Sequence, residues 1–305
     1  MTTLIRVIET ALPVLATLLL GMFCREKKFL TREGIDTLKK VAVNLTLPFV
    51  LLNAFATAEY SGPALIQPLL IFILCNVALV IGMVLCKILK LPGKLPAYLA
   101  TGFEAGMLGY ALFVLLFPGE GTANFAILDL GQVLFVFTVY KALLSGKGNL
   151  KAVLKDILVS PIIWAITAGL IIGATGLYRA MGDWGVAGIL DSLTSFLSGP
   201  TGMIILLTIG YDLVLKEIKW LETSRYIILR LVTAAILIGI ILAVNRLLLG
   251  GMIHEGAAIL LMILPPPYVL PIFADDPGQR TALSSALSAL TLVSLIIFAV
   301  MTALV

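Results

Sequence analysis

Residues Thr101–Tyr110, TGFEAGMLGY, and Leu264–Phe273, LPPPYVLPIF, each lie midway along a hydrophobic segment of the chain. Glycines interrupt the first stretch, which also carries Glu104, and prolines interrupt the second. Hydrocarbon offers no water to a broken helix, so such interruptions are tolerated only where they are buried in protein or line a wet cavity. We therefore expect these two stretches to carry the function of the protein.

The composition is typical of a polytopic membrane protein. Hydrophobic residues make up 60% of the 305 residues and charged residues 12%, and the mean hydropathy is +1.11, whereas soluble domains carry about 25% charged residues. The net charge of +4 comes from basic residues between apolar runs, so we expect no nucleic-acid partner. Cys24, Cys75 and Cys86 are odd in number and lack metal-ligand spacing, so we expect neither a disulfide framework nor a cofactor.

Ten apolar runs are long enough to cross a bilayer as helices, which takes about 20 residues each. In chain order they are Leu4–Cys24, Val41–Thr57, Ala64–Leu89, Leu95–Phe117, Phe125–Leu144, Ile157–Leu177, Leu190–Tyr211, Tyr226–Leu248, Ala257–Phe273 and Ala282–Leu304. We therefore predict an all-α membrane protein with ten transmembrane spans, of which spans 4 and 9 are broken and cross each other.

The basic residues support this count. Ten spans leave only Arg6, Arg179 and Arg246, of 21 Lys and Arg residues, on one side of the membrane. The others, including Arg230 in the connection from span 7 to span 8, then lie on the side that the positive-inside rule assigns to the cytoplasm. We expect a multi-pass protein of the cell membrane with both termini extracytoplasmic.

The two halves of the chain resemble each other. Proline recurs at matching places in spans 1 and 6 and in spans 2 and 7. The pairs are Pro13 with Pro161 and Pro48 with Pro200. Because five spans per repeat is an odd number, the second copy must be inverted, which is the architecture that lets one site open to either side in turn. We predict a first repeat over 1–155 and a second over 156–305.

Glu104 is the candidate coupling residue. It lies nine residues past Leu95, about 14 Å along a helix, where an unpaired charge costs about 2.5–3.5 kcal/mol. We expect it to carry H⁺ or to bind Na⁺; the alternative is a protonated carboxyl hydrogen-bonded between helices. Asp129 and Gln132 share a helical face and would extend this site, while a solvated or capping role for Asp129 stays open.

The interruptions themselves are the candidate binding site. Each half-helix begins with free N–H groups and about half a positive charge, so two such ends together would attract an anion. The alternative is a proline-kinked helix and a glycine packing face. On span 2, Asn44 is the candidate cavity-facing amide. The predicted binding residues are Asn44, Glu104, Gly106, Gly109, Tyr110, Pro265, Pro266, Pro267 and Tyr268.

Enzyme motifs are incomplete. Tyr211-Asp212 matches half of an intramembrane aspartyl protease, but the partner Gly-x-Gly-Asp is missing, and so is the Gly-x-Ser-Gly of a serine protease. We expect no enzymatic activity.

Four stretches of the chain resemble the auxin efflux carrier family, which includes the plant PIN-type carriers and lies within the bile acid/sodium symporter superfamily. These stretches are Leu264–Pro266 with Phe273-Ala274, Glu104–Gly109, Asp129–Gly131 with Phe135–Thr138, and Asn44–Pro48. Two positions depart from the family pattern. Ala111 stands where the family has a proline, and Glu104 stands where it has an asparagine that contacts an organic anion in the plant carriers.

The resemblance implies a homodimer with elevator-like motion. Spans 1, 2, 6 and 7, about 1–57 and 157–211, would form the scaffold, and spans 3–5 and 8–10, about 64–144 and 226–304, the mobile transport unit. We expect a secondary transporter of small organic solutes, with organic anions such as auxin-like or dicarboxylic acids as first candidates. The carboxylate of Glu104 favours coupling to H⁺ or Na⁺, or a less acidic substrate. The alternative is a membrane sensor or scaffold that binds a solute without moving it.

Overall fold

The structure is a computed structural model that describes residues 2–58, 60, 65–144, 159–213, 218, 220–268, 270 and 277–304. All regular elements over these residues are helical. The chain divides into two compact units, each assembled from three separate stretches. Unit 1 comprises Met1–Leu65, Gly106–Ile127 and Leu154–Leu213, and unit 2 comprises Ile66–Ala105, Leu128–Val153 and Val214–Val305.

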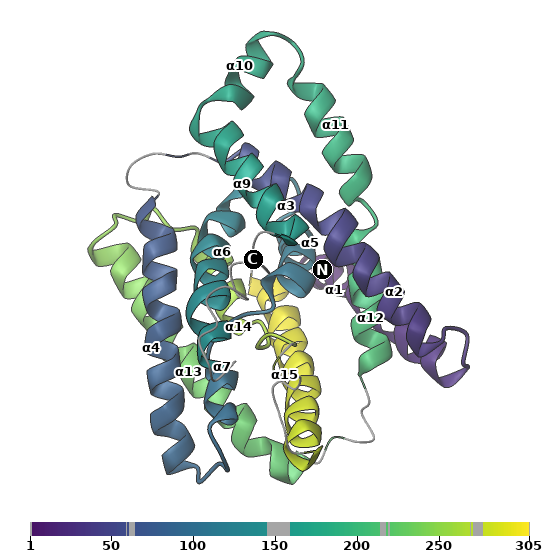
Figure 1. Cartoon of the computed structure of the whole chain (residues 1–305), viewed down its shortest axis with the longest axis vertical. Coiled ribbons are helices and arrows are strands. Elements are labelled where there is room, and N and C mark those ends of the chain that lie inside the picture. Colours follow the sequence, from purple (N-terminus) through teal and green to yellow (C-terminus); the bar gives the residue numbers. More distant parts are fainter. Residues whose placement is uncertain are drawn as a thin grey trace. The chain divides into compact units, whose positions relative to one another are not determined.

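Unit 1 is built on one packed helix pair and one group of three packed helices (Figure 1). Its elements are α1 (Thr2–Glu26), α2 (Arg32–Val41), the π-helical turn η1 (Ala42–Thr46), α3 (Leu47–Ala56), α5 (Tyr110–Leu116), α9 (Pro161–Ala174), α10 (Leu177–Asp183), α11 (Ala187–Ser198) and α12 (Thr201–Asp212). Helix α1 packs along α12, and α3 packs along both α9 and α11. These helix contacts bury part of the apolar surface of unit 1.

Glycines set the distance between α1 and α12. A Cβ atom at Gly210 would overlap the carbonyl oxygen of Leu18, and one at Gly21 would overlap that of Leu207. Small residues let transmembrane helices approach until their backbones touch, which supplies van der Waals packing where lipid offers no hydrophobic driving force. The contact between these two helices therefore depends on the missing side chains.

Asp212, at the end of α12, ties this helix to α2. Its carboxylate accepts hydrogen bonds from Arg32 Nη1 at 2.6 Å and from Lys39 Nζ. Nearby, Arg25 Nη1 donates to the carbonyls of Tyr211 and Leu213 at 2.8 and 2.6 Å. The Tyr211-Asp212 pair thus has a structural role at one end of unit 1.

Unit 2 is centred on one long helix (Figure 1). Its elements are α4 (Ile66–Ile88), the 3₁₀ helix η3 (Leu95–Ala100), the π-helical turn η5 (Val136–Tyr140), α7 (Lys141–Leu144), α13 (Trp220–Leu247), α14 (Glu255–Ile263) and α15 (Pro277–Leu304). Helix α13 packs against α4, η3, α14 and α15. Two further elements, the π-helical turn η4 (Ala105–Gly109) and α6 (Ala123–Phe135), run across the boundary between the units.

Six helical segments of the described chain are long and apolar enough to cross a membrane. They are Arg32–Ala56, Ile66–Ile88, Ala123–Leu144, Ala187–Asp212, Trp220–Leu247 and Gly278–Ala303. A seventh is added if α9 and α10, which meet at a bend of 63°, form one span. Together with the composition, these helices identify a multi-pass membrane protein. The count of ten spans, the inverted repeat and the division into scaffold and transport unit stay predictions.

The predicted breaks of spans 4 and 9 are present. Span 4 consists of η3, a non-helical segment at 101–104, and then η4 with α5. Span 9 consists of α14 followed by non-helical residues 264–267. The end of predicted span 9, with Pro271 and Phe273, lies outside the described residues.

Substituting alanine at Gly210 tests the close contact of α1 with α12. Alanine normally stabilises a helix by about 0.5–1 kcal/mol relative to glycine, but here the added methyl meets backbone, and overpacking of this kind costs about 1–3 kcal/mol. We expect Gly210→Ala to lower the melting temperature of the detergent-solubilised protein. Gly188→Ala on α11, where a Cβ meets nothing within 4 Å, is the control and should not lower it. Equal melting temperatures for the two variants would contradict this account.

Candidate functional site

The first interruption is a segment of extended chain in unit 2. After η3 ends at Ala100, Thr101 adopts an extended conformation, and its hydroxyl donates to the carbonyl of Cys75 on α4 at 2.6 Å. Gly102 follows with φ +70°, a left-handed conformation that side chains disfavour. A Cβ at Gly102 would lie 2.9 Å from Cγ of Pro267. Glycine is therefore required at this point, both for its backbone angle and for its closeness to the second interruption.

The second interruption follows from three consecutive prolines. Helix α14 ends at Ile263, and Leu264 already has φ −57° and ψ 151°. Pro265, Pro266 and Pro267 cannot donate hydrogen bonds, and each disfavours helix in the residue before it. The hydroxyl of Ser294 on α15 donates to the carbonyl of Ile263 at 2.6 Å, which satisfies one of the acceptors that the helix end leaves open.

Glu104 joins the two interruptions. Its backbone N–H donates to the carbonyl of Pro265 at 2.9 Å, and its carboxylate oxygen Oε2 accepts from the backbone N–H of Tyr268 at 2.8 Å. Both bonds lie within unit 2. The sequence predicts that the N–H of Tyr268 faces a substrate anion; the group that it meets in the structure is the side-chain carboxyl of Glu104.

Arg230 is a member of this site that the sequence motifs do not reveal. It lies on α13 with 4% of its surface exposed, and Nη1 donates to the carbonyl of Leu99 at 3.2 Å. Nη2 donates to the carbonyls of Gly102 at 3.1 Å and Leu264 at 2.6 Å. The expectation that Arg230 belongs to the connection between spans is wrong, because the residue is buried in unit 2.

A sequence signal for Arg230 exists. It is the one charged residue in the apolar run 226–245, and a charge inside a transmembrane helix is by default a functional candidate. Because it lies only five residues after Arg225, it is grouped on sequence alone with the basic residues that precede span 8.

Asp129 and Gln132 reach the first interruption through a hydrogen-bonded chain. Both are buried in unit 2, and Gln132 Nε2 donates to Asp129 Oδ1 at 3.1 Å and to the carbonyl of Phe103 at 2.9 Å. The structure thus brings both predicted coupling residues next to the segment that carries Glu104. Within the described residues, Gln132 Oε1, Tyr140 Oη and Arg230 Nε are buried without a hydrogen-bond partner.

The start of α14 is anchored outside the apolar region. His254 caps the helix by accepting from the N–H of Ala257 at 2.9 Å. Arg246 at the end of α13 donates through Nε and Nη2 to the two carboxylate oxygens of Glu255, at 2.9 and 2.7 Å. This guanidinium lowers the pKa of the Glu255 carboxyl, so the pair persists to more acidic pH than an isolated glutamate would allow. The pair fixes α14 to α13 before the chain enters the second interruption.

Unit 1 contains a pocket of about 440 Å³. Its walls come from α1, α3, η4, α5, α12 and the loop before α12, and the lining residues carry no charge. They are Pro13, Thr17, Val50, Asn53, Gly106, Tyr110, Ala111, Val114, Leu115, Thr122, Ser198, Gly199, Thr201, Gly202, Met203, Ile205 and Leu206. Of the predicted binding residues, Gly106 and Tyr110 line this pocket. Gly109 is buried in η4, and Asn44 is exposed on η1; Asn53, one helical segment later, supplies the amide instead.

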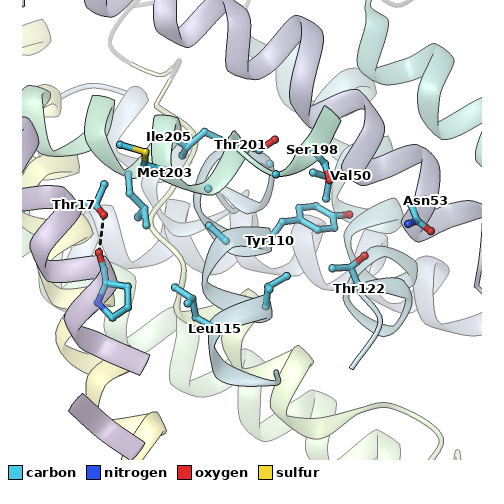
Figure 2. Close-up of a pocket in the computed structure, with 17 residues that line it drawn as sticks. Thr17, Val50, Asn53, Tyr110, Leu115, Thr122, Ser198, Thr201, Met203 and Ile205 are labelled. Atoms are coloured by element: carbon cyan, nitrogen blue, oxygen red, sulfur yellow. Dashed lines mark hydrogen bonds between the residues drawn. The ribbon is translucent and has the colours of Figure 1, made fainter. Parts of the chain in front are cut away.

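Tyr110 is the central side chain of this pocket. Figure 2 shows its ring in the middle, with the hydroxyl pointing toward the side where Asn53 and Thr122 lie. Its ring packs edge-on against Phe125 at a centroid distance of 5.0 Å. Thr201 Oγ1 is buried, and in the described part of the chain it has no hydrogen-bond partner. The pocket therefore combines an apolar surface with a few hydroxyl and amide groups.

The described residues contain no group of three or more His, Cys, Asp or Glu side chains that could hold a metal ion.

Comparison with known proteins points to transport. No protein-family model matches the chain. It is similar to an uncharacterized transporter of Methanothermobacter thermautotrophicus, with 26% identity over 216 residues that cover 67% of each chain. It is also similar to an uncharacterized transporter of Methanocaldococcus jannaschii, with 26% identity over 221 residues that cover 70% of each chain. Neither name states a substrate, and the resemblance to the auxin efflux carriers stays a prediction.

Alanine at Gly102 tests the contact between the two interruptions. A side chain at positive φ costs about 1–2 kcal/mol, and the collision with Pro267 adds about 1–3 kcal/mol. Gly119→Ala isolates the first contribution, because Gly119 has φ +88° but an added methyl there would meet nothing within 4 Å. We expect Gly102→Ala to melt at a clearly lower temperature than Gly119→Ala in detergent. A smaller loss at Gly102 than at Gly119 would show that the contact does not stabilise the protein.

Proposed function

We propose that the protein is a secondary membrane transporter of small organic solutes. The observation that carries this proposal is the pair of interrupted helices joined through Glu104. Interrupted helices that meet within a multi-pass protein are typical of substrate and ion sites in secondary transporters. The two similar proteins, both named as transporters, support the same class.

We further propose that the solute is neutral or weakly acidic, and binds with little net charge. The pocket in unit 1 has no charged lining residue to balance a carboxylate, and burying an unpaired charge costs far more than burying a hydrogen-bonded polar group. Hydroxyl and amide groups on an apolar surface suit an aromatic or aliphatic solute with one or two polar groups. Organic acids that enter in their protonated form fit this description better than dicarboxylate anions.

Coupling would run through H⁺ at Glu104. A carboxyl group near the middle of the membrane favours its neutral form unless it is hydrogen-bonded, and here the bond from the N–H of Tyr268 stabilises the ionised form. A carboxyl group between these opposing influences is suited to gain and lose a proton during a cycle. Alternation would involve elevator-like movement of the predicted transport unit, spans 3–5 and 8–10; this motion, and assembly as a homodimer, are parts of the proposal.

Glu104→Gln tests the proton step. In proteoliposomes we expect wild-type uptake of a radiolabelled weak acid, with indole-3-acetic acid as the first probe and the dicarboxylic malonic acid as the comparison, to follow an imposed pH gradient. The variant should keep its fold, because the glutamine oxygen can still accept the N–H of Tyr268, but lose the response to the gradient, because an amide cannot take up the proton. The matched control is Glu33→Gln on the exposed side of α2.

Two results would count against this proposal. An unchanged pH response in Glu104→Gln would remove Glu104 from the coupling step. Solute binding without any uptake by the wild type would favour the alternative of a sensor or scaffold.

Thr201→Val tests the pocket in unit 1. Valine keeps the shape and removes the unpartnered hydroxyl, so a solute that bonds to Thr201 should bind about tenfold more weakly, as expected for one lost hydrogen bond. The measurement is the thermal shift of purified protein titrated with the acid that performs best in the uptake screen. Thr17→Val is the control, since Thr17 lines the same pocket but already donates to Pro13 at 2.7 Å. Equal affinities of the two variants would place the solute elsewhere.

A further inference from the structure

Arg230 binds backbone oxygens from both interruptions at once. Its guanidinium lies within hydrogen-bond distance of the carbonyls of Leu99 and Gly102 from the first and of Leu264 from the second. The guanidinium carbon also lies 4.8 Å from the ring centre of Phe103, a distance at which a cation is attracted to an aromatic face. Every one of these contacts lies within unit 2.

These oxygens belong to the places where helices end. Leu99 is in the last turn of η3, and Leu264 directly follows the last residue of α14. Carbonyls at a helix C-terminus have lost their helical donors and carry the negative end of the dipole. In transporters with broken helices, unwound carbonyls and half-helix C-termini are the groups that coordinate Na⁺. The cluster around Arg230 thus has the chemistry of a cation site.

The charge of Arg230 is balanced by dipoles. Among the described residues the guanidinium forms no ion pair, and its contacts are the three carbonyls and the Phe103 ring. A buried arginine held only for structural pairing would normally meet a carboxylate. A fixed cation that replaces a bound metal ion needs no carboxylate, because the oxygens that would coordinate the ion accept hydrogen bonds from Nη1 and Nη2; Nε has no partner among the described residues.

We propose that the guanidinium of Arg230 is a permanently bound positive charge that occupies a Na⁺-type site of carbonyl oxygens between the two interruptions. It would hold the two interruptions together without a bound metal ion. As a positioning residue, it keeps Gly102 and Leu264 in place and thereby Glu104 opposite Tyr268. For transport, which rests on the proposed function above, the consequence is that Na⁺ has no place at these three oxygens, which favours H⁺ at Glu104 as the coupling ion.

Chemical rescue of Arg230→Ala tests this role in the purified full-length protein. Wild type and the control Arg225→Ala, which removes an exposed arginine of the same helix, should each melt at the same temperature in NaCl as in choline chloride. We expect Arg230→Ala to melt about 5 °C or more below the control, as a loss of a few kcal/mol implies for a chain of this size. Millimolar ethylguanidinium should recover at least half of this difference, whereas urea at the same concentration should not. Na⁺ should also stabilise this variant, since it can enter the vacated site.

Three outcomes would overturn the proposal: a wild-type melting temperature that depends on Na⁺, an Arg230→Ala variant as stable as the control, or a destabilised variant that neither ethylguanidinium nor Na⁺ rescues. Arg230→Lys, which keeps the charge with a smaller donor group, covers the case in which the alanine variant does not fold. It should fold and remain insensitive to Na⁺, and a Na⁺-dependent melting temperature in this variant would equally reject the proposal. Melting needs no transport, so successful rescue together with absent uptake would reject only the proposed function.

Discussion

Backbone groups released by a break in a membrane helix must find partners inside the protein. In hydrocarbon each unsatisfied N–H or C=O costs several kcal/mol, so two broken helices are stable only if their free groups are matched. In unit 2, the two interruptions provide part of these partners for each other. Glu104 supplies an acceptor for the N–H of Tyr268 and a donor for the carbonyl of Pro265, and Arg230 supplies donors for carbonyls of both breaks.

Side chains of the protein itself provide the partners of these backbone groups. The partial charges of the helix ends are largely balanced by charges of the protein, a carboxylate at a free N–H and a guanidinium at the free carbonyls. A solute therefore need not bring a charge of its own to bind. The uncharged pocket of unit 1, with Tyr110 at its centre, agrees with a substrate of low charge.

Helix packing in unit 2 also holds the two interruptions in place. Helix α13 contacts α4, η3, α14 and α15, so the helix that carries Arg230 also holds the elements on which the two breaks lie. Ser294 on α15 and Thr101 add single hydrogen bonds at the edges of the breaks. The positions of the two short non-helical segments are therefore fixed by the helices packed around them.

The sequence by itself determined the membrane class and the location of both interruptions, and it identified Glu104 as the candidate coupling residue. Hydrophobic length, proline and glycine are local signals, and each acts on its own stretch of chain. Only the tertiary structure decided which groups meet: that the N–H of Tyr268 faces Glu104, that Arg230 is buried among carbonyls, and that Asn53 lines a pocket while Asn44 is exposed. These contacts join residues as far apart as 164 positions, and hydrophobic periodicity contains no information about which distant backbone groups a side chain will reach.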